Sequence, residues 1–121
     1  MNVVQARRLA ERNIARNPTS IVIKRIQDID DGAGGSYKGE VELPAQVVRV
    51  FLSNLGQTKD VVGEGGQIQV QRWGLLAKWD ADIQVDDKFE VDGRRFGIRS
   101  VFPVRTGGEI ASYQADLEEV S

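Results

Sequence analysis

Cysteine and histidine are both missing from this chain of 121 residues. Without cysteine there is no disulfide framework and no zinc site with thiolate ligands. Without histidine the chain lacks the usual general base at neutral pH and the commonest side-chain ligand of transition metals. These absences argue against most hydrolase and metalloenzyme functions. We therefore expect a protein that is not an enzyme and that holds neither a cofactor nor a metal.

Long apolar segments are missing as well. No run approaches the roughly 20 residues that a membrane-spanning helix needs, and the opening stretch MNVVQARRLAERN lacks the apolar centre of a signal peptide. We expect a protein made in a reducing cytoplasm, with no membrane partner. The length suits a single domain over residues 1–121, and the apolar fraction of 40% permits a real core.

Neither sign of charge dominates, because the net charge is −2, but the charges are distributed unevenly. Residues 1–25 carry six basic groups against one acidic group, whereas residues 26–47 carry one basic group against five acidic groups. Residues 78–121 carry six basic and ten acidic groups. The basic N-terminal part could meet a nucleic acid, an acidic surface of a neighbouring subunit, or only solvent.

Residues spaced three and four apart predict an α-helix over about residues 2–16, with Asn2 as its N-cap and Asn17-Pro18 as its end. One face carries the expected buried stripe, which consists of Val3, Ala6, Leu9, Ala10, Asn13 and Ile14. The opposite face carries the arginines, which are Arg7, Arg8, Arg12 and Arg16. We expect this helix to lie against a sheet or a neighbouring chain.

Alternating and β-branched segments after the helix predict six or seven short antiparallel strands. The clearest pair surrounds Asp92-Gly93, which is a strong signal for a hairpin with a type I′ turn. A second turn is expected at Gly107-Gly108, and a polar turn at Asp86-Asp87 separates strand residues Ile83 and Val85 from the hairpin. The fold class that follows is mainly β, a small antiparallel β-barrel or sandwich over about residues 20–118.

The expected core includes all four phenylalanines, namely Phe51, Phe89, Phe96 and Phe102. Two glycine-bearing segments, at about residues 28–39 and 56–66, interrupt the strand pattern and predict long loops. Loops of this length are unusual in so small a domain and often carry function.

Motifs for metal or phosphate binding are weak. DIDDG, starting at Asp28, opens like a calcium loop, but Gly39 stands where a bidentate glutamate is needed. The GAGG and GEGG stretches lack the following helix and lysine of a phosphate-binding loop. Asp80 and Asp82 would share one side of a strand, and an acidic turn is the better interpretation of that pair.

Two binding functions remain open from the residues alone. Four aromatic side chains could stack bases on an OB-like barrel that binds single-stranded nucleic acid, and they are Trp73, Trp79, Tyr37 and Tyr113. A barrel could also bind a small molecule or carbohydrate, which would require a preformed apolar pocket. Aromatic residues make up only 7% of the chain, and the C-terminal strands are acidic.

An ordered set of segments resembles a known family. RNPTSIVIKR after a helix, RWGLLAKWDADIQVDDKFEVDGRRFGIRSV and the closing ASYQADLEEV together resemble the head-closure proteins (stoppers, or head–tail connectors) of long-tailed bacteriophages and prophages. The similarity covers most of the chain. It implies a small β-barrel in a ring, commonly of twelve subunits, in the virion neck, and assembly in the host bacterial cytoplasm. Related tail-completion proteins share parts of the pattern.

The resemblance also implies partners and a channel loop. The partners are further copies of the chain, the portal-adaptor protein, a tail-completion or tail-terminator protein and, transiently, double-stranded DNA; the free protein is expected to be monomeric. By position, the loop that closes the channel spans residues 28–39 and includes Asp28, Asp30, Asp31, Gly32, Gly34, Gly35, Tyr37 and Lys38. Charge predicts an interface between two groups of residues, Arg7, Arg8, Arg12 and Arg16 on one side and Asp80, Asp82, Asp86 and Asp87 on the other.

Overall fold

One helix and eight strands make up the computed structural model, which describes residues 1–52 and 72–120. In chain order they are α1 (Val3–Arg16), β1 (Thr19–Ile21), β2 (Lys24–Asp30), β3 (Ser36–Glu42), β4 (Gln46–Leu52), β5 (Trp73–Lys78), β6 (Lys88–Val91), β7 (Arg94–Thr106) and β8 (Glu109–Val120). The mainly β class is confirmed. The predicted loop at 56–66 and the start of the strand predicted at 67 lie outside the described residues.

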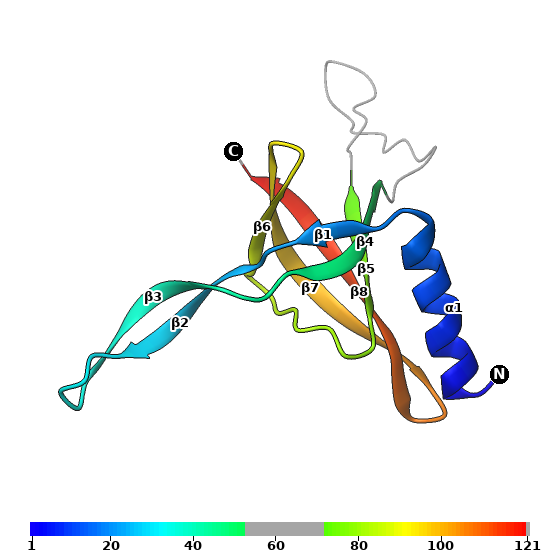
Figure 1. Cartoon of the computed structure of the whole chain (residues 1–121), viewed down its shortest axis with the longest axis horizontal. Helices are drawn as coiled ribbons and strands as arrows, with labels where there is room; N and C mark the ends of the chain where they lie inside the picture. The colour runs from blue at the N-terminus through cyan, green and yellow to red at the C-terminus, as the bar shows by residue number, and fades with distance from the viewer. Residues whose placement is uncertain (53–71, 121) are drawn as a thin grey trace, which may run out of the picture.

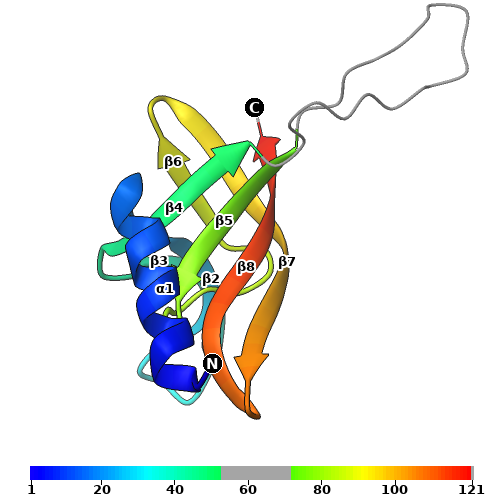
Figure 2. The same cartoon turned by 90° about the vertical axis from the view of Figure 1, so that its right-hand side faces the viewer.

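The eight strands form one antiparallel sheet in the order β1-β4-β5-β8-β7-β6-β2-β3. The sheet curves strongly, and β1 approaches β6 (Figure 1, Figure 2). Among the described residues no ladder joins the two ends of this order, so a closed barrel is not confirmed. The strand count exceeds the predicted six or seven, partly because the segment 20–27 contributes to two strands, β1 and β2, instead of one.

The core lies inside the curve of the sheet and follows the two-residue alternation of the strands. Its fully buried members include Ile21, Val48, Leu75, Phe96 and Ile98. The turn segment 79–87 contributes Ile83 to the same cluster.

Two of the four phenylalanines expected in the core, Phe89 and Phe96, are buried as predicted. Phe51 is only partly buried, and the prediction for Phe102 is wrong, because its side chain is 51% exposed. A β-bulge between Ile98 and Ser100 shifts the alternation, so that Val101 packs against the core instead.

Helix α1 begins and ends as predicted. The Asn2 side chain accepts a hydrogen bond from the Gln5 N–H at 2.9 Å, and the Asn2 N–H donates to the Gln5 side chain at 3.1 Å. The helix packs across β4, β5 and β8 and buries Ala10 and Ile14. Leu9, which was expected in the buried stripe, is 45% exposed. Among the described helices, none has the length and apolar character needed to cross a membrane.

The segment between β5 and β6 differs from the prediction. Residues 79–87 form turns without a strand, so Ile83 and Val85 do not alternate along a ladder. Ile83 is buried and Val85 is exposed. The segment ends where the Ile98 N–H donates to the Asp87 carbonyl and the Asp86 N–H donates to the Ile98 carbonyl, each at 2.9 Å.

Both predicted hairpin turns are confirmed. Asp92 and Gly93 have φ values of 51° and 78°, and Gly107 and Gly108 have φ values of 63° and 84°. Positive φ at both central positions is the requirement of a type I′ turn. These turns fix the register of β6 with β7 and of β7 with β8.

Gly108→Ala should destabilise the protein by about 1 kcal/mol, because a side chain raises the energy of the left-handed conformation even in open space. Gly97→Ala is the matched control, since Gly97 lies in β7 with an ordinary φ and room for a methyl group. Thermal unfolding should show a lower midpoint for the first variant and an unchanged or higher midpoint for the second. A higher midpoint for Gly108→Ala would contradict the assignment of the turn.

Candidate functional site

Strands β2 and β3 form a two-stranded arm, residues 24–42, which projects from the body on the side away from α1 (Figure 1). Seven residue pairs join its strands, from Lys24 opposite Glu42 at the root to Asp30 opposite Ser36 at the tip. In the part of the chain that the structure describes, Lys24 is the one residue of the arm that also pairs with a strand of the body, where it lies opposite Lys88 of β6. The channel segment predicted as a long loop is therefore mostly a strand ladder, and only residues 31–35 form its turn.

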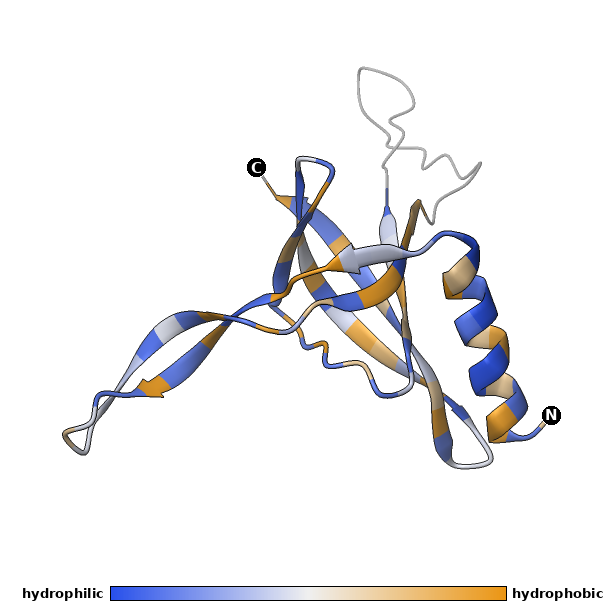
Figure 3. Ribbon diagram, viewed as in Figure 1, coloured by the Kyte–Doolittle hydropathy of each residue, from blue (hydrophilic) through white to orange (hydrophobic). Residues whose placement is uncertain are grey.

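Cross-strand partners explain why this polar stretch is extended. Asp28 lies opposite Lys38, so opposite charges face each other on one side of the arm. On the other side, Ile29 lies opposite Tyr37, and a Cβ atom added to Gly39 would overlap with Ile29. Figure 3 shows that the arm is largely hydrophilic with isolated apolar positions.

The tip of the arm is held by its own aspartates. Asp30 Oδ1 accepts a hydrogen bond from the Gly32 N–H at 2.9 Å, and Asp31 Oδ1 accepts from the N–H groups of Ala33 and Gly35 at 2.8 and 3.1 Å. Gly32 has φ 79°, a conformation that glycine adopts without a steric cost. Asp30 and Asp31 thus shape the turn, and their carboxylates also give the tip its negative charge.

At the root of the arm, Arg25 turns into the body and binds two carboxylates. Its Nε donates to Asp87 Oδ1 at 2.8 Å, and its Nη2 donates to Asp87 Oδ2 at 2.9 Å and to Asp82 Oδ1 at 3.0 Å. The Gln84 N–H donates to Asp87 Oδ2 at 2.7 Å. Asp87 is only 1% exposed, so this pair is desolvated and ties the arm to residues 82–87.

These contacts also explain the ionisation of Arg25. The hydrogen bond to Asp87 raises the pKa of Arg25 above its usual value, and Asp82 adds to this effect, whereas burial acts in the opposite direction. The Gln46 side chain holds Asp82 in place, because its Nε2 donates to the Asp82 carbonyl and its Oε1 accepts from the Asp82 N–H, both at 2.9 Å. The root is therefore a connected polar network.

The basic face of α1 lies on the other side of the body. Arg8, Arg12 and Arg16 are exposed. Arg7 lies on the inner side of the helix, where its Nε donates to the Ile110 carbonyl at 3.0 Å and its guanidinium stacks on Trp79 at 4.1 Å. Three of the four predicted interface arginines are thus available to another molecule, and Arg7 already has partners within the chain.

The predicted acidic half of the interface is divided in the same way. Asp80 and Asp86 are exposed in the turn segment. Asp82 and Asp87 instead bind Arg25, so the carboxylate of Asp87 is used inside the fold. Sequence reasoning missed Arg25, although Ile21, Ile23 and Arg25 share the inward phase of one extended segment. A charged residue at an inward-facing position of an otherwise apolar extended segment was the available signal.

The aromatic side chains proposed to stack bases do not gather on one face. Trp73 packs edge-to-face on Phe96 at 5.3 Å, and Trp79 lies under Arg7. Tyr37 stands on the arm, where it is 56% exposed. Tyr113 lies half-buried against the core. This arrangement offers no common stacking platform in the described part of the chain.

Charged side chains line one hollow on the surface of the described residues. This hollow has a volume of about 630 Å³, lies beside β7 and β8, and carries charges of both signs. Two of them, Arg99 and Glu118, form a pair at 3.9 Å in which both side chains are more than half exposed. No group of carboxylates in residues 1–52 and 72–120 could hold a metal ion.

Comparison with known proteins gives no family and only loose structural likeness. No family model matches the chain, and no curated protein matches it. A chain from the structure of the virion of a native gene transfer agent (GTA) particle aligns with a TM-score of 0.47 and 19% sequence identity. The alignment covers 84% of this chain and 94% of that chain.

Proposed function

We propose that this chain is a structural neck protein of a phage-like particle, without catalytic activity. In this proposal it forms a ring, commonly of twelve copies, between the portal-adaptor and the tail, and the tip of its arm lines or closes the DNA channel. The proposal rests on the sequence resemblance to head-closure proteins and on one structural observation, which is the projecting arm. A ribbon that projects away from its own core exposes its faces and its outer edge to other molecules.

The position of the charges supports a ring. Residues 26–42 of the arm carry five carboxylates and one lysine, whereas the exposed arginines of α1 lie on the other side of the body (Figure 1). A head-to-tail interface joins two different patches on each subunit, and it closes into a ring when the rotation between subunits fits. Surfaces of opposite charge on one subunit are suited to such contacts, because the acidic arm can meet a basic surface of the next copy and the arginines of α1 can meet an acidic surface of the adaptor.

The charge of the tip suits a DNA channel. Packaged DNA would be repelled by Asp30 and Asp31, whereas an arginine-lined pore would bind the phosphates through release of counterions. The glycines of the turn let many copies of the tip crowd near an axis. The tip therefore favours passage or loose closure of a duplex over tight binding.

Electron microscopy of the protein mixed with the portal and adaptor proteins of its own particle tests this function. We expect an additional ring below the adaptor, with the arms directed towards the axis. A ring at the tail end alone would favour the related tail-completion function. Absence of any added density on portal-adaptor complexes would overturn the proposal.

Shortening the arm should separate closure from assembly. In the variant, Asn-Gly replaces residues 30–36, so that Ile29 and Tyr37 flank a two-residue turn and the rest of the ladder stays. We expect rings that form normally but particles that lose packaged DNA, measured as nuclease-sensitive DNA after packaging. Asp30→Asn, which keeps the length of the arm, is the control. Full genome retention by the shortened variant would argue against a role in closure.

Charge reversal on α1 should weaken assembly. Replacing Arg8, Arg12 and Arg16 by glutamate removes the exposed basic face, and we expect less binding to portal-adaptor complexes together with a smaller dependence on salt. Light scattering at rising ionic strength measures both effects. Assembly of the unmodified protein that is indifferent to salt would contradict an electrostatic interface at this helix.

A further inference from the structure

Half of β7 has a free edge. β7 pairs with β8 along nearly its whole length, but β6 pairs with it only from Arg94 to Gly97. Beyond Ile98, residues 99–106 have no second strand partner in the described part of the chain. On this stretch Phe102 and Val104 are exposed. A bare edge with exposed apolar side chains is a template for pairing with another strand.

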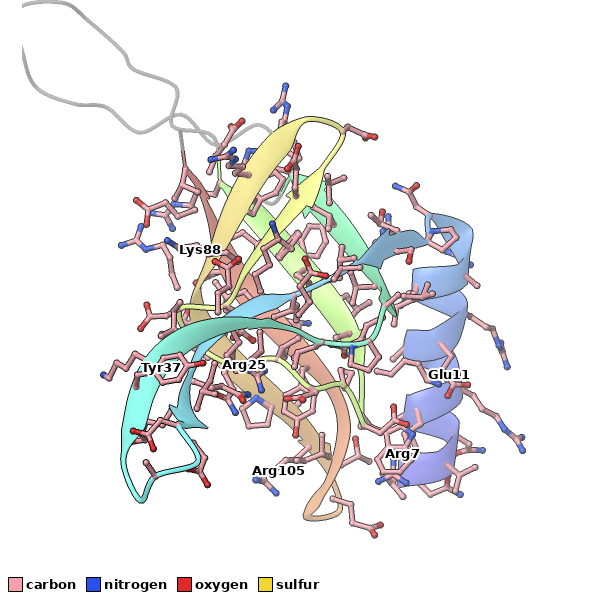
Figure 4. All side chains as sticks on the ribbon, turned by 60° about the vertical axis from the view of Figure 1, so that its left-hand side comes forward. Arg7, Glu11, Arg25, Tyr37, Lys88 and Arg105 are labelled. Atoms are coloured by element: carbon pink, nitrogen blue, oxygen red, sulfur yellow. The ribbon has the colours of Figure 1, made fainter. Side chains whose placement is uncertain are left out.

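The arm has a free edge of similar length. β3 has seven residues and carries exposed Tyr37, and in residues 1–52 and 72–120 its one strand partner is β2. Figure 4 shows Tyr37 on the arm and Arg105 near the far end of β7. A two-stranded ribbon is only marginally stable in water by itself, and further strands stabilise it. Both edges therefore gain from a partner strand.

The two edges are complementary in charge. β7 carries four arginines and no carboxylate along its 13 residues. The arm from residue 26 to residue 42 carries the five carboxylates and one lysine described above. Among the described residues, Arg99 forms an exposed pair with Glu118 at 3.9 Å, and Arg105 donates to the Gly108 carbonyl at 3.4 Å. Both arginines can therefore turn to an acidic partner at little cost.

From these observations we propose that β3 of one copy pairs with the free edge of β7, residues 99–106, of the next copy. The contact adds the arm to the neighbour's sheet, in the manner of β-augmentation. Because it joins two different patches, it is head-to-tail and repeats around an axis. This inference rests on the proposed ring and identifies two surfaces that join its subunits. Residues 31–35 stay free for the channel.

Pro103 limits the number of hydrogen bonds that this contact can form. Proline has no N–H group, so the β7 edge can offer no donor at that position. Such a residue blunts a free edge against indiscriminate pairing, while the residues around it can still pair. The contact should therefore be weak for a single pair of chains and become stable in a closed ring, where each copy makes it twice.

Cysteine crosslinking between two copies tests the proposal directly, because the native chain has no cysteine. Ser36→Cys marks β3, and Val104→Cys marks the free edge of β7. The two variants are mixed at high concentration with a short bis-maleimide crosslinker. We expect the mixed dimer to form about tenfold faster than dimers within either variant alone. Ala15→Cys on α1, mixed with Ser36→Cys, is the control and should show no such preference.

Charge reversal provides the second measurement. Replacing Arg99 and Arg105 by glutamate should slow formation of the mixed dimer by about tenfold, since like charges would then face each other. Replacing Glu40 and Glu42 by lysine on the β3 partner should restore it. Equal crosslinking in all mixtures, or no rescue, would overturn the proposal. This outcome would leave the neck function standing, because rings below the adaptor would still be seen by electron microscopy.

Discussion

Replacing Asp87 by alanine should lower the free energy of unfolding by about 3–5 kcal/mol, because it leaves Arg25 buried with half of its partners removed. Asp82 still binds one nitrogen of the guanidinium, but that carboxylate is largely exposed. For a domain of this size the change corresponds to a fall of roughly 10–20 °C in the midpoint of thermal unfolding. Differential scanning calorimetry or circular dichroism measures it.

Asp80→Ala is the matched control, since it removes an exposed carboxylate from the same segment and should change the stability by no more than about 0.5 kcal/mol. The double variant Arg25→Met with Asp87→Leu should recover much of the loss, because apolar side chains can replace a buried ion pair. Its recovery is incomplete, since the Gln84 N–H loses its acceptor. Equal stability of Asp87→Ala and Asp80→Ala would contradict a structural role for the pair.

The same pair should show no pH dependence that originates in Arg25. A raised pKa means that the stabilisation is fully present below the unfolded-state pKa of arginine and is lost only as the pH rises through the higher folded-state value. Both values lie far above neutral, so Arg25 stays charged from about pH 6 to about pH 9. Hydrogen exchange of the arm in Asp87→Ala should therefore be faster than in the native protein throughout that range.

Phe96→Ala should be the second variant with a large effect, with a loss of about 3–5 kcal/mol. The ring is 1% exposed and lies between Trp73, at 5.3 Å, and Phe89, at 5.6 Å. Removing it leaves a cavity at the centre of the core and ends two aromatic contacts. Urea unfolding gives the free energy difference.

Phe102→Ala is the control for that measurement, because it removes the same side chain from an exposed position on the same strand. We expect a change within about 0.5 kcal/mol for the isolated protein. A large loss for Phe102→Ala, or a small one for Phe96→Ala, would mean that the β-bulge does not set the phase of β7 as described.

Short-range signals predicted much of the fold. The helix was predicted from Asn2, Pro18 and the spacing of Ala10 and Ile14, because capping and periodicity act within a few residues. Two hairpins were predicted from Asp92-Gly93 and Gly107-Gly108, since few residues accept positive φ at both positions of a turn.

Features that depend on distant partners were not predicted. The arm is rich in aspartate and glycine, which disfavour strands, and only pairs such as Asp28 with Lys38 make it extended. The bulge after Ile98 reversed the expected burial of Phe102. Asp87 was expected on an interface because its partner, Arg25, lies 62 residues earlier in the chain.

The candidate site was predicted in part. The exposure of Arg8, Arg12 and Arg16 follows from helical periodicity. The position of residues 28–39 away from the core followed from their composition. Their conformation and the free edge of β7 depend on strand order, which one sequence does not fix.

The anchored root of the arm has a thermodynamic consequence. Because Arg25 fixes the direction of β2 when the chain folds, the orientational entropy of the arm is lost during folding of the monomer. A partner that meets the arm then finds it preorganised and faces a smaller entropic barrier to association. Weak contacts between copies can therefore suffice, and the strength of an assembly is set in part by a guanidinium group that no second molecule touches.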